Sequence, residues 1–214
     1  MKTIRIDIIS DIVCPWCFIG YRQLERALDM AGLNGDIHWH PFELNPAMPA
    51  QGEDMADHIA RKYGASAEQS AATRQQMQAI AAPLGISFAA RSTRIWNSRA
   101  AHQLLHWARD SGRQTALKLA LFDAYFTRGE NVSDPAVLLD AVAAAGLPRA
   151  LAREVLENNS FADDVAAAEA RWPDMNITGV PAMIIAERGL VMGAQGEERL
   201  AAALRKMAEL SPAA

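Results

Sequence analysis

Long apolar runs and basic blocks are absent from the 214 residues of this chain. Without about 18 consecutive apolar residues, no membrane-spanning helix is expected. The net charge of −4 and the lack of clustered Lys and Arg argue against a nucleic-acid surface and against binding to anionic membranes. The first residues reach Asp7 and Asp11 without the apolar segment of a secretion signal. We therefore expect a cytoplasmic protein, in which a catalytic disulfide is expected more often than a structural one.

Cysteine is also scarce, because Cys14 and Cys17 are the only two in the chain. They flank Pro15 and Trp16, between a strand-like apolar run and a helical pattern. Two thiols at this spacing can close a small disulfide ring with little backbone movement. The strand-to-helix context places the first sulfur at the positive end of a helix. This arrangement is typical of a redox-active dithiol in a thioredoxin-like fold.

The two sulfurs are expected to have different roles. Cys14 would lie at the exposed helix N-terminus, where unpaired backbone N–H groups and the helix dipole stabilise a thiolate. Pro15 lacks an N–H, and its fixed φ suits the first helical turn. Cys17 would lie one turn into the helix, more buried, and act as the resolving thiol that attacks a mixed disulfide.

The first 50 residues predict two strands and one helix. Residues 3–9 and 36–42 alternate apolar and polar positions, which is typical of strands. Residues 16–31 predict a helix that ends at Gly32. Because a strand–helix–strand crossover returns the chain in the same direction, the two strands are expected to be parallel.

Residues 53–171 are rich in Ala, Leu, Gln, Arg and Glu, with almost no strand signal, and predict about five to seven helices. Strand patterns return at 181–186 and 190–192 as a hairpin, followed by a helix over 197–209. The chain therefore predicts an α/β, thioredoxin-like fold with a large all-helical insertion.

In this division, residues 1–50 and 176–214 form a discontinuous thioredoxin-like domain, and residues 51–175 form the inserted helical subdomain. The strand after the insertion opens with Val180-Pro181. In thioredoxin-like folds this X-Pro bond is cis and its loop faces the cysteine pair. The backbone of Val180 would then pair with an extended substrate, as in strand addition. We expect Val180, Pro15 and Trp16 to contact substrate.

A zinc site is an alternative for the cysteine pair. It would need two more ligands, and His102 and His106 are the available pair. Both fall on the polar flank of the helical stripe over residues 100–108, so we expect solvated histidines and no metal. Asp11 is expected to hold a loop or a cap rather than to accept a proton from the buried thiol. Trp16 is either a substrate-facing platform or a partly buried anchor.

Beyond the cysteine motif, an ordered set of segments extends over nearly the full length of the chain. These are residues 10–20 (SDIVCPWCFIG), 41–46 (PFELNP), 101–102 (AH), 121–126 (LFDAYF), 177–181 (ITGVP) and 193–195 (GAQ). With these segments the chain resembles the DsbA-like thioredoxin superfamily and, more narrowly, the FrnE-type dithiol oxidoreductases.

The resemblance implies a cytoplasmic thiol–disulfide oxidoreductase. In it Cys14 is the nucleophile, Cys17 is the resolving thiol and Pro181, in a cis peptide bond, clamps the substrate backbone. The partners would be protein or small-molecule thiols and disulfides, with glutathione as a candidate redox partner and no bound cofactor. Because no second cysteine motif is present, a thiol relay within one chain is excluded. The oligomeric state is left open.

Two other functions compete with this one. A sister branch of the fold comprises the kappa-class glutathione transferases and the 2-hydroxychromene-2-carboxylate isomerases. It generally carries serine at the first cysteine position and uses glutathione as a cofactor. Because this chain keeps both cysteines, redox chemistry is favoured, and a glutathione-dependent isomerase or transferase is the alternative. The third hypothesis is a non-enzymatic module that holds extended peptides in an apolar groove.

Overall fold

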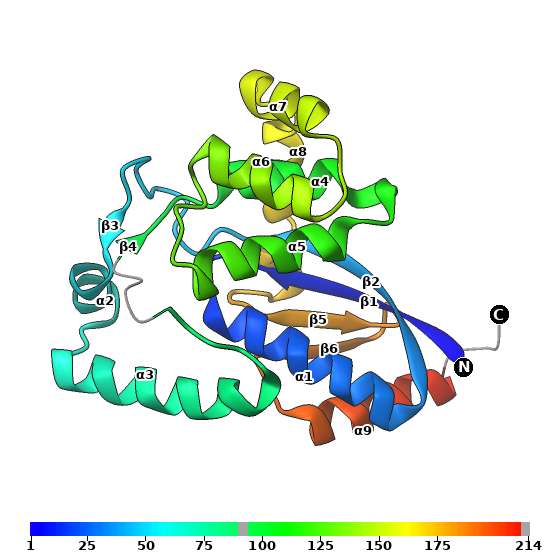
Figure 1. Ribbon diagram of the computed structural model, residues 1–214. Helices are drawn as coiled ribbons and strands as arrows, with labels where there is room; N and C mark the ends of the chain where they lie inside the picture. Colours follow the sequence, from blue (N-terminus) through cyan, green and yellow to red (C-terminus); the bar gives the residue numbers. More distant parts are fainter. Residues whose placement is uncertain (90–93, 211–214) are drawn as a thin grey trace.

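The computed structural model describes residues 1–89 and 94–210. Its main sheet has four strands in the order β2-β1-β5-β6 (Figure 1). The strands β1 (Lys2–Ser10) and β2 (Leu33–Pro41) are parallel over their whole lengths, as predicted. The helix α1 (Pro15–Ala31) connects them and ends at Gly32, whose φ of 68° is the left-handed conformation that glycine adopts readily.

The C-terminal half of the sheet is the predicted hairpin. The strand β5 (Ala182–Ile185) pairs antiparallel with β1 and with β6 (Gly189–Met192). The predicted strands leave residues 187–189 for the turn between them, whereas the observed turn begins one residue earlier, at Ala186. Ala186 and Glu187 have φ values of 51° and 57°, in the left-handed region used by tight hairpin turns. The helix α9 (Glu197–Leu210) follows, and residues 211–214 of the predicted segment 176–214 lie outside the described residues.

Between β2 and β5 the described part of the chain contains seven α-helices, within the predicted five to seven. It also contains two short paired strands, β3 (Glu53–Asp54) and β4 (Arg94–Ile95), so the insertion is not entirely helical. Residues 90–93 of the predicted insertion lie outside the described residues. The helices are α2 (Met55–Tyr63), α3 (Ala67–Ala81), α4 (Arg99–Trp107), α5 (Gln114–Phe122), α6 (Pro135–Ala144), α7 (Arg149–Asn158) and α8 (Ala162–Glu169).

The ends of these helices follow local sequence rules. Asp54 accepts hydrogen bonds from two backbone N–H groups at the start of α2, and Gly64 ends that helix with φ of 65°. Ser66 and Gln69 form a reciprocal capping box at the start of α3. Asp134 caps α6 by accepting a hydrogen bond from the backbone N–H of Ala136, and Pro135 follows as the first helical residue.

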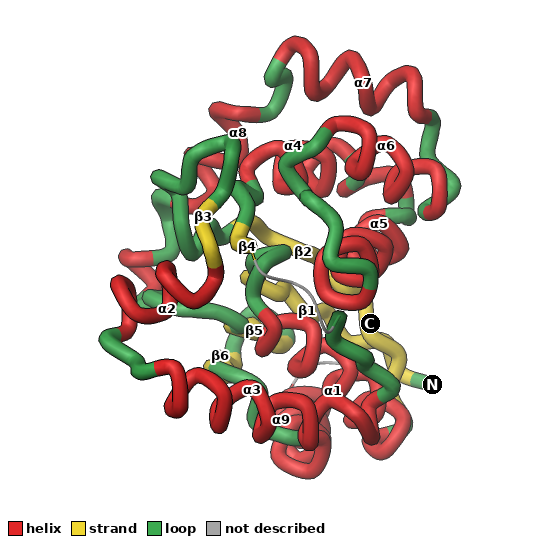
Figure 2. The backbone as a smooth tube through the Cα atoms, turned by 60° about the vertical axis from the view of Figure 1, so that its left-hand side comes forward, coloured by secondary structure: helices red, strands yellow, loops and turns green. Residues whose placement is uncertain are grey.

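The insertion and the sheet share one hydrophobic core. In Figures 1 and 2 the helices α4 to α8 gather on the β2 side of the sheet, and α1 lies next to α9. Phe18 of α1 stacks on Phe122 at 4.9 Å between ring centroids and on Phe126 at 6.0 Å. One cluster of buried residues therefore continues from the strands through α1 into the insertion. The helix that carries the cysteines is packed by both parts of the chain.

Candidate active site

The Cys-Pro-Trp-Cys segment forms the start of α1, where the sequence predicts it. Cys14 is the N-cap residue, with φ of −94° and ψ of 109°, and Pro15 is the first helical residue. The backbone N–H of Cys17 donates to the carbonyl of Cys14 at 3.0 Å. No acidic side chain lies in the first turn of the helix. The partial positive charge of the helix end is therefore not neutralised by a neighbouring carboxylate of α1.

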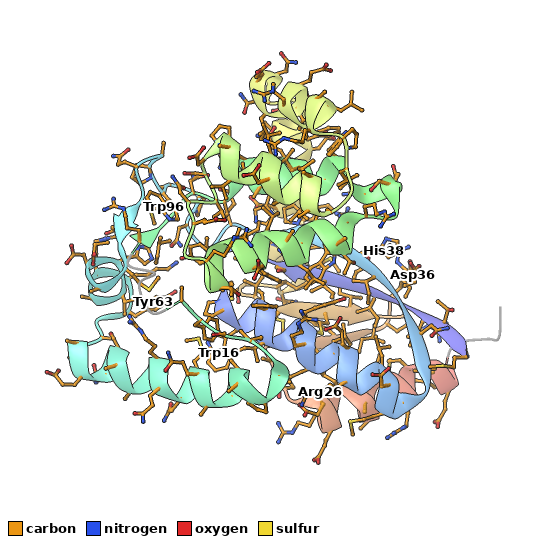
Figure 3. The ribbon with its side chains drawn as sticks, viewed as in Figure 1. Trp16, Arg26, Asp36, His38, Tyr63 and Trp96 are labelled. Carbon is orange, nitrogen blue, oxygen red and sulfur yellow. The ribbon has the colours of Figure 1, made fainter. Side chains whose placement is uncertain are left out.

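The expected exposure of Cys14 is wrong. Cys14 is only 3% exposed and Cys17 only 1% exposed, and neither cysteine forms a disulfide. The loop before β5 covers the sulfur, because the Cys14 thiol donates to the carbonyl oxygen of Val180 at 3.7 Å. Figure 3 shows Trp16 on the side of α1 that faces α3, and Tyr63 at the end of α2 nearest the start of α1. The burial comes from segments distant in sequence.

Tyr63 marks the approach to the cysteine pair. Its side chain is largely exposed, and its pKa is raised, first by partial burial and then by the negative charge of a Cys14 thiolate. Trp16 is half-buried and packs against the main core cluster. Of the two predicted roles for Trp16, a partly buried anchor fits this position.

The ionisations of the two thiols are linked, because the Cys14 thiol can donate to Cys17 in place of the Val180 carbonyl when Cys17 is ionised. The hydrogen bond to Cys17, followed by burial, raises the pKa of Cys14 well above its usual value. Burial also opposes ionisation of Cys17, but the hydrogen bond from Cys14 and the positive charge of Lys118 outweigh it and lower its pKa. Within the pair, the negative charge is therefore favoured on Cys17, beside Lys118.

Lys118 of α5 supplies a buried positive charge beside this pair. Its residue is only 1% exposed, and its Nζ lies 5.2 Å from the ring centroid of Trp39 and 4.9 Å from that of Phe122. Burial lowers the pKa of Lys118 to about 8, while the negative charge of Cys17, followed by that of Asp11, opposes the decrease. The lysine thus remains mostly charged at neutral pH and stabilises the Cys17 thiolate.

The sequence interpretation missed Lys118, although a signal is present. In the helical pattern of α5, Lys118 follows Leu117 and lies four residues before Phe122, on the buried face. A lysine inside an apolar stripe is uncommon, because its burial is costly without a negative partner. That pattern marks Lys118 as a candidate site residue without indicating which group it faces.

Asp11 and His102 form a second buried polar pair close to the cysteines. Asp11 Oδ2 accepts from the backbone N–H of Leu44 at 2.8 Å, and Oδ1 lies 3.3 Å from His102 Nε2. Burial is the largest influence and raises the pKa of Asp11, but the interactions with His102, the backbone N–H of Leu44 and Ser98 together outweigh it, and the net pKa is lowered. Asp11 therefore holds the loop after β2, as predicted, and ties it to α4.

The predicted solvent exposure of His102 is wrong. The side chain of His102 is 1% exposed, because α4 packs against β2 and turns that flank of the helix toward Asp11. Burial lowers the pKa of His102, against the effect of Asp11. His106, in contrast, is only partly buried. Within residues 1–89 and 94–210, no group of three or more His, Cys, Asp or Glu side chains is arranged to hold a metal ion.

The Val180–Pro181 peptide bond is cis. Pro181 packs directly on α1, since a Cβ added at Gly20 would lie 3.2 Å from its Cγ. Of the residues expected at the site, Cys14, Cys17 and Val180 are in contact, and Pro15, Trp16 and Pro181 adjoin them in the chain. No helix among the described residues is long and apolar enough to cross a membrane.

A family model for the DsbA-like thioredoxin domain matches residues 5–205. The chain belongs to the DsbA-like thioredoxin family. Family members are generally thiol–disulfide oxidoreductases, and the DsbA-like thioredoxin fold agrees with the predicted α/β fold and helical insertion.

The chain is similar to three further proteins over most of its length. The probable DsbA oxidoreductase SCO1869 from Streptomyces coelicolor has a crystal structure with 31% identity and a TM-score of 0.89, covering 98% of this chain and 92% of its own. YwbO of Bacillus subtilis (strain 168) is 27% identical over 199 residues, which are 92% of this chain and 93% of YwbO. The cytosolic disulfide reductase DsbM from Pseudomonas aeruginosa, in its structure with GSH, shares the fold at 16% identity. Its TM-score is 0.67, over 96% of this chain and 99% of DsbM.

Proposed function

We propose that this DsbA-like protein exchanges a Cys14–Cys17 disulfide or dithiol with protein or small-molecule thiols. One contact supports the proposal most directly. The Cys14 thiol donates to the carbonyl oxygen of Val180 at 3.7 Å, and its ionisation is linked to that of Cys17. A nucleophile, a resolving thiol and a backbone acceptor for an extended substrate therefore adjoin at one point.

In the proposed reaction the protein starts with a Cys14 thiol and a Cys17 thiolate. The proton passes from Cys14 to Cys17, and the Cys14 thiolate attacks one sulfur of a substrate disulfide. The substrate S–S bond breaks, one substrate thiolate leaves with the electron pair, and it takes the proton from Cys17. The Cys17 thiolate then attacks Cys14, closes the 14–17 disulfide and releases the second substrate thiolate, which solvent protonates. Two electrons pass from the cysteine pair to the substrate, and the reverse sequence oxidises substrate thiols.

The surrounding residues support these steps. Lys118 lowers the pKa of Cys17 and so favours both the resting thiolate and its second attack. Tyr63 and Trp16 flank the approach to Cys14, and Val180 offers its backbone beside the attacked sulfur. Pro15 and Pro181 hold the two segments that meet there. These are the roles we propose for the residues of the site.

Glutathione is the proposed small-molecule redox partner, rather than a bound cofactor, and the cytoplasm is the proposed location. The likeness to cytosolic DsbM, whose structure was determined with GSH, supports both proposals at the level of the fold. Because both thiols are free and adjacent, the redox function is favoured over the glutathione-dependent isomerase or transferase.

Two cysteine variants test this function. Cys17→Ser should trap a mixed disulfide between Cys14 and a substrate thiol, detectable by mass spectrometry, and should stop turnover. Cys14→Ser should abolish exchange altogether. Full thiol exchange by Cys14→Ser would refute the proposal. Turnover of a glutathione-dependent isomerisation by Cys17→Ser would favour the alternative.

The reduction potential identifies the direction of exchange. The purified protein should be equilibrated against mixtures of reduced and oxidised glutathione, with tryptophan fluorescence as the signal and mass spectrometry to verify the disulfide. A single two-electron transition is expected, within the range of about −270 to −120 mV covered by enzymes of this fold. A protein that binds glutathione and forms no 14–17 disulfide would overturn the redox function.

A further inference from the structure

A separate cavity of about 330 Å³ lies beside the Val180 loop. Its walls come from the end of β2, the end of α8 and the segment that leads to β5. They include Phe42, Glu43, Glu169, Trp172, Ile177 and Thr178. None of these residues takes part in the thiol chemistry described above, and the cavity has room for a long side chain.

The cavity adjoins the cysteine pair through the backbone. Thr178 lines it and precedes Val180 by two residues. Phe42 and Val180 pack against the same small buried cluster, which includes Trp172 and Ile177. A substrate strand advances about 3.3 Å per residue. A peptide paired with the Val180 backbone would therefore bring a side chain within about two residues of its reacting cysteine to the mouth of the cavity.

Two carboxyl groups at the cavity have an oxygen without a partner. The side chain of Glu43 is 1% exposed, and its Oε1 accepts from Arg99 Nε at 2.9 Å. Its Oε2 is buried and receives no hydrogen bond, and the same is true of Glu169 Oε1. Buried polar atoms without partners are rare because they cost free energy. Among the described residues, the half-exposed Arg99 forms an ion pair with Glu43, and its positive charge also acts on Glu169.

The charge balance indicates which ligand would fit. Burial, followed by the negative charge of Glu43, raises the pKa of Glu169 to about 7. A cation with N–H donors would satisfy both free oxygens and offset this repulsion. The apolar walls formed by Phe42, Trp172 and Ile177 suit the methylene stem of a long side chain. Two carboxyl groups without a third ligand do not suit a metal ion, and no such group of three exists in the described part of the chain.

We propose that this cavity binds a lysine or arginine side chain of a peptide substrate, close to the cysteine that reacts with Cys14. The proposal rests on the proposed thiol–disulfide exchange and adds a substrate class to it. Glu43 and Glu169 accept the hydrogen bonds of the cationic group, and Thr178 and Val180 connect this subsite to the reacting sulfur.

The test compares short reduced peptides that contain one cysteine. Four positions are tested, the two before the cysteine and the two after it. For each position there is one peptide with Lys there and one with norleucine, which has the same aliphatic stem and no charge. The rate constant is measured for reduction of the oxidised protein at pH 8, with tryptophan fluorescence as the signal. Because a nearby lysine also changes the reactivity of the peptide thiol, the same Lys-to-norleucine ratio is measured with a small aromatic disulfide. The ratio for the protein is then divided by that value.

With the wild-type protein, lysine at one position should react about tenfold faster than norleucine after this correction. Glu43→Gln and Glu169→Gln should each remove most of the preference, while Glu157→Gln, an exposed change in α7, should leave it intact. Glu169→Gln also leaves the Glu43–Arg99 ion pair in place. If Glu43→Gln unfolds, the second variant therefore keeps the test valid.

Three results would overturn the proposal. The first is a corrected ratio near one at every position, and the second is a ratio that both Gln variants retain. The third is a loss of reaction with glutathione in the Gln variants while the lysine preference remains, which would assign the cavity to the amino group of glutathione. If no peptide with or without lysine reduces the wild-type protein, the thiol–disulfide function itself fails, and this inference fails with it.

Discussion

Replacing Lys118 with methionine should make the protein more stable and its cysteine pair less reactive. Methionine keeps the length and most of the apolar stem of lysine and removes the charge. Because Lys118 is buried beside Cys17, the charge favours the thiolate and at the same time costs free energy of folding. The two effects have opposite consequences for stability and reactivity, so a single variant tests both.

The expected gain in stability follows from the pKa of the lysine. A pKa change of one is worth about 1.4 kcal/mol. Lowering the pKa of Lys118 from 10.5 to about 8 therefore costs the folded protein about 3 kcal/mol at neutral pH, because the group is charged in both states there. Between pH 8 and 10.5 the unfolded chain holds a proton that the folded protein has lost, so wild-type stability rises. The advantage of the variant should shrink over this range.

The expected loss of reactivity follows from the thiolate. Without Lys118 the pKa of Cys17 rises, so less Cys17 thiolate is available for the second step, in which Cys17 attacks the mixed disulfide. For each tenfold fall in the thiolate fraction, the more basic thiolate is intrinsically about threefold more nucleophilic, so closure of the 14–17 disulfide slows about threefold near pH 7. A less stabilised thiolate also makes the reduced form less stable, which should lower the reduction potential by about 30 mV for each tenfold change in the equilibrium constant.

Three measurements on Lys118→Met check these values, with the exposed Lys206→Met as the matched control. Guanidinium unfolding of the reduced proteins at pH 7 and pH 10 gives the stabilities. Stopped-flow reaction with oxidised glutathione gives the rates, and equilibration with glutathione gives the potentials. A variant that is less stable than wild type at pH 7, with an unchanged reaction rate, would show that Lys118 does not act on the cysteine pair as described.

Asp11→Asn should lose about 2 kcal/mol of stability in urea unfolding, because the buried hydrogen-bonded carboxylate is removed. The same change removes a negative charge that raises the pKa of Cys14, so alkylation near pH 7 should be faster, and an unchanged rate would contradict this account. The pKa of Asp7 is lowered by hydrogen bonds that outweigh burial, the first from His40. Its contribution to stability is therefore present above about pH 4 and lost as the pH falls, and Asp7→Asn should flatten the urea midpoint between about pH 4 and 2.5. Gly52→Ala should cost about 2 kcal/mol, because the added Cβ would lie 2.5 Å from the carbonyl oxygen of Ile95 at a φ of 65°. Equal midpoints in thermal unfolding would exclude the clash.

Local sequence signals predicted the elements of the fold well. The alternating strands, the glycine after α1 and the cap at Asp134 depend on neighbours within a few residues, so the sequence reveals them directly. The paired β3 and β4 were missed, because two-residue strands carry no periodicity and depend on a partner about 40 residues away.

The candidate site was predicted only where it is local. Cys14 and Cys17 are separated by two residues, and their motif fixes their place at the start of α1. The polar partners of the site are not local, because Lys118 and His102 reach it from the insertion. Their effect on the thiols depends on how the insertion packs, and a single sequence carries only the indirect sign of a polar residue in an apolar stripe.

The aromatic stack of Phe18 on Phe122 and Phe126 has a consequence for how this fold diversifies. The cysteine helix takes part of its packing, and the charge beside Cys17, from the insertion. If the insertion were exchanged between two relatives, the packing of α1 and the charge beside Cys17 would change together with the surface that faces the substrate. In this architecture, a change in substrate specificity is therefore expected to change the reduction potential as well.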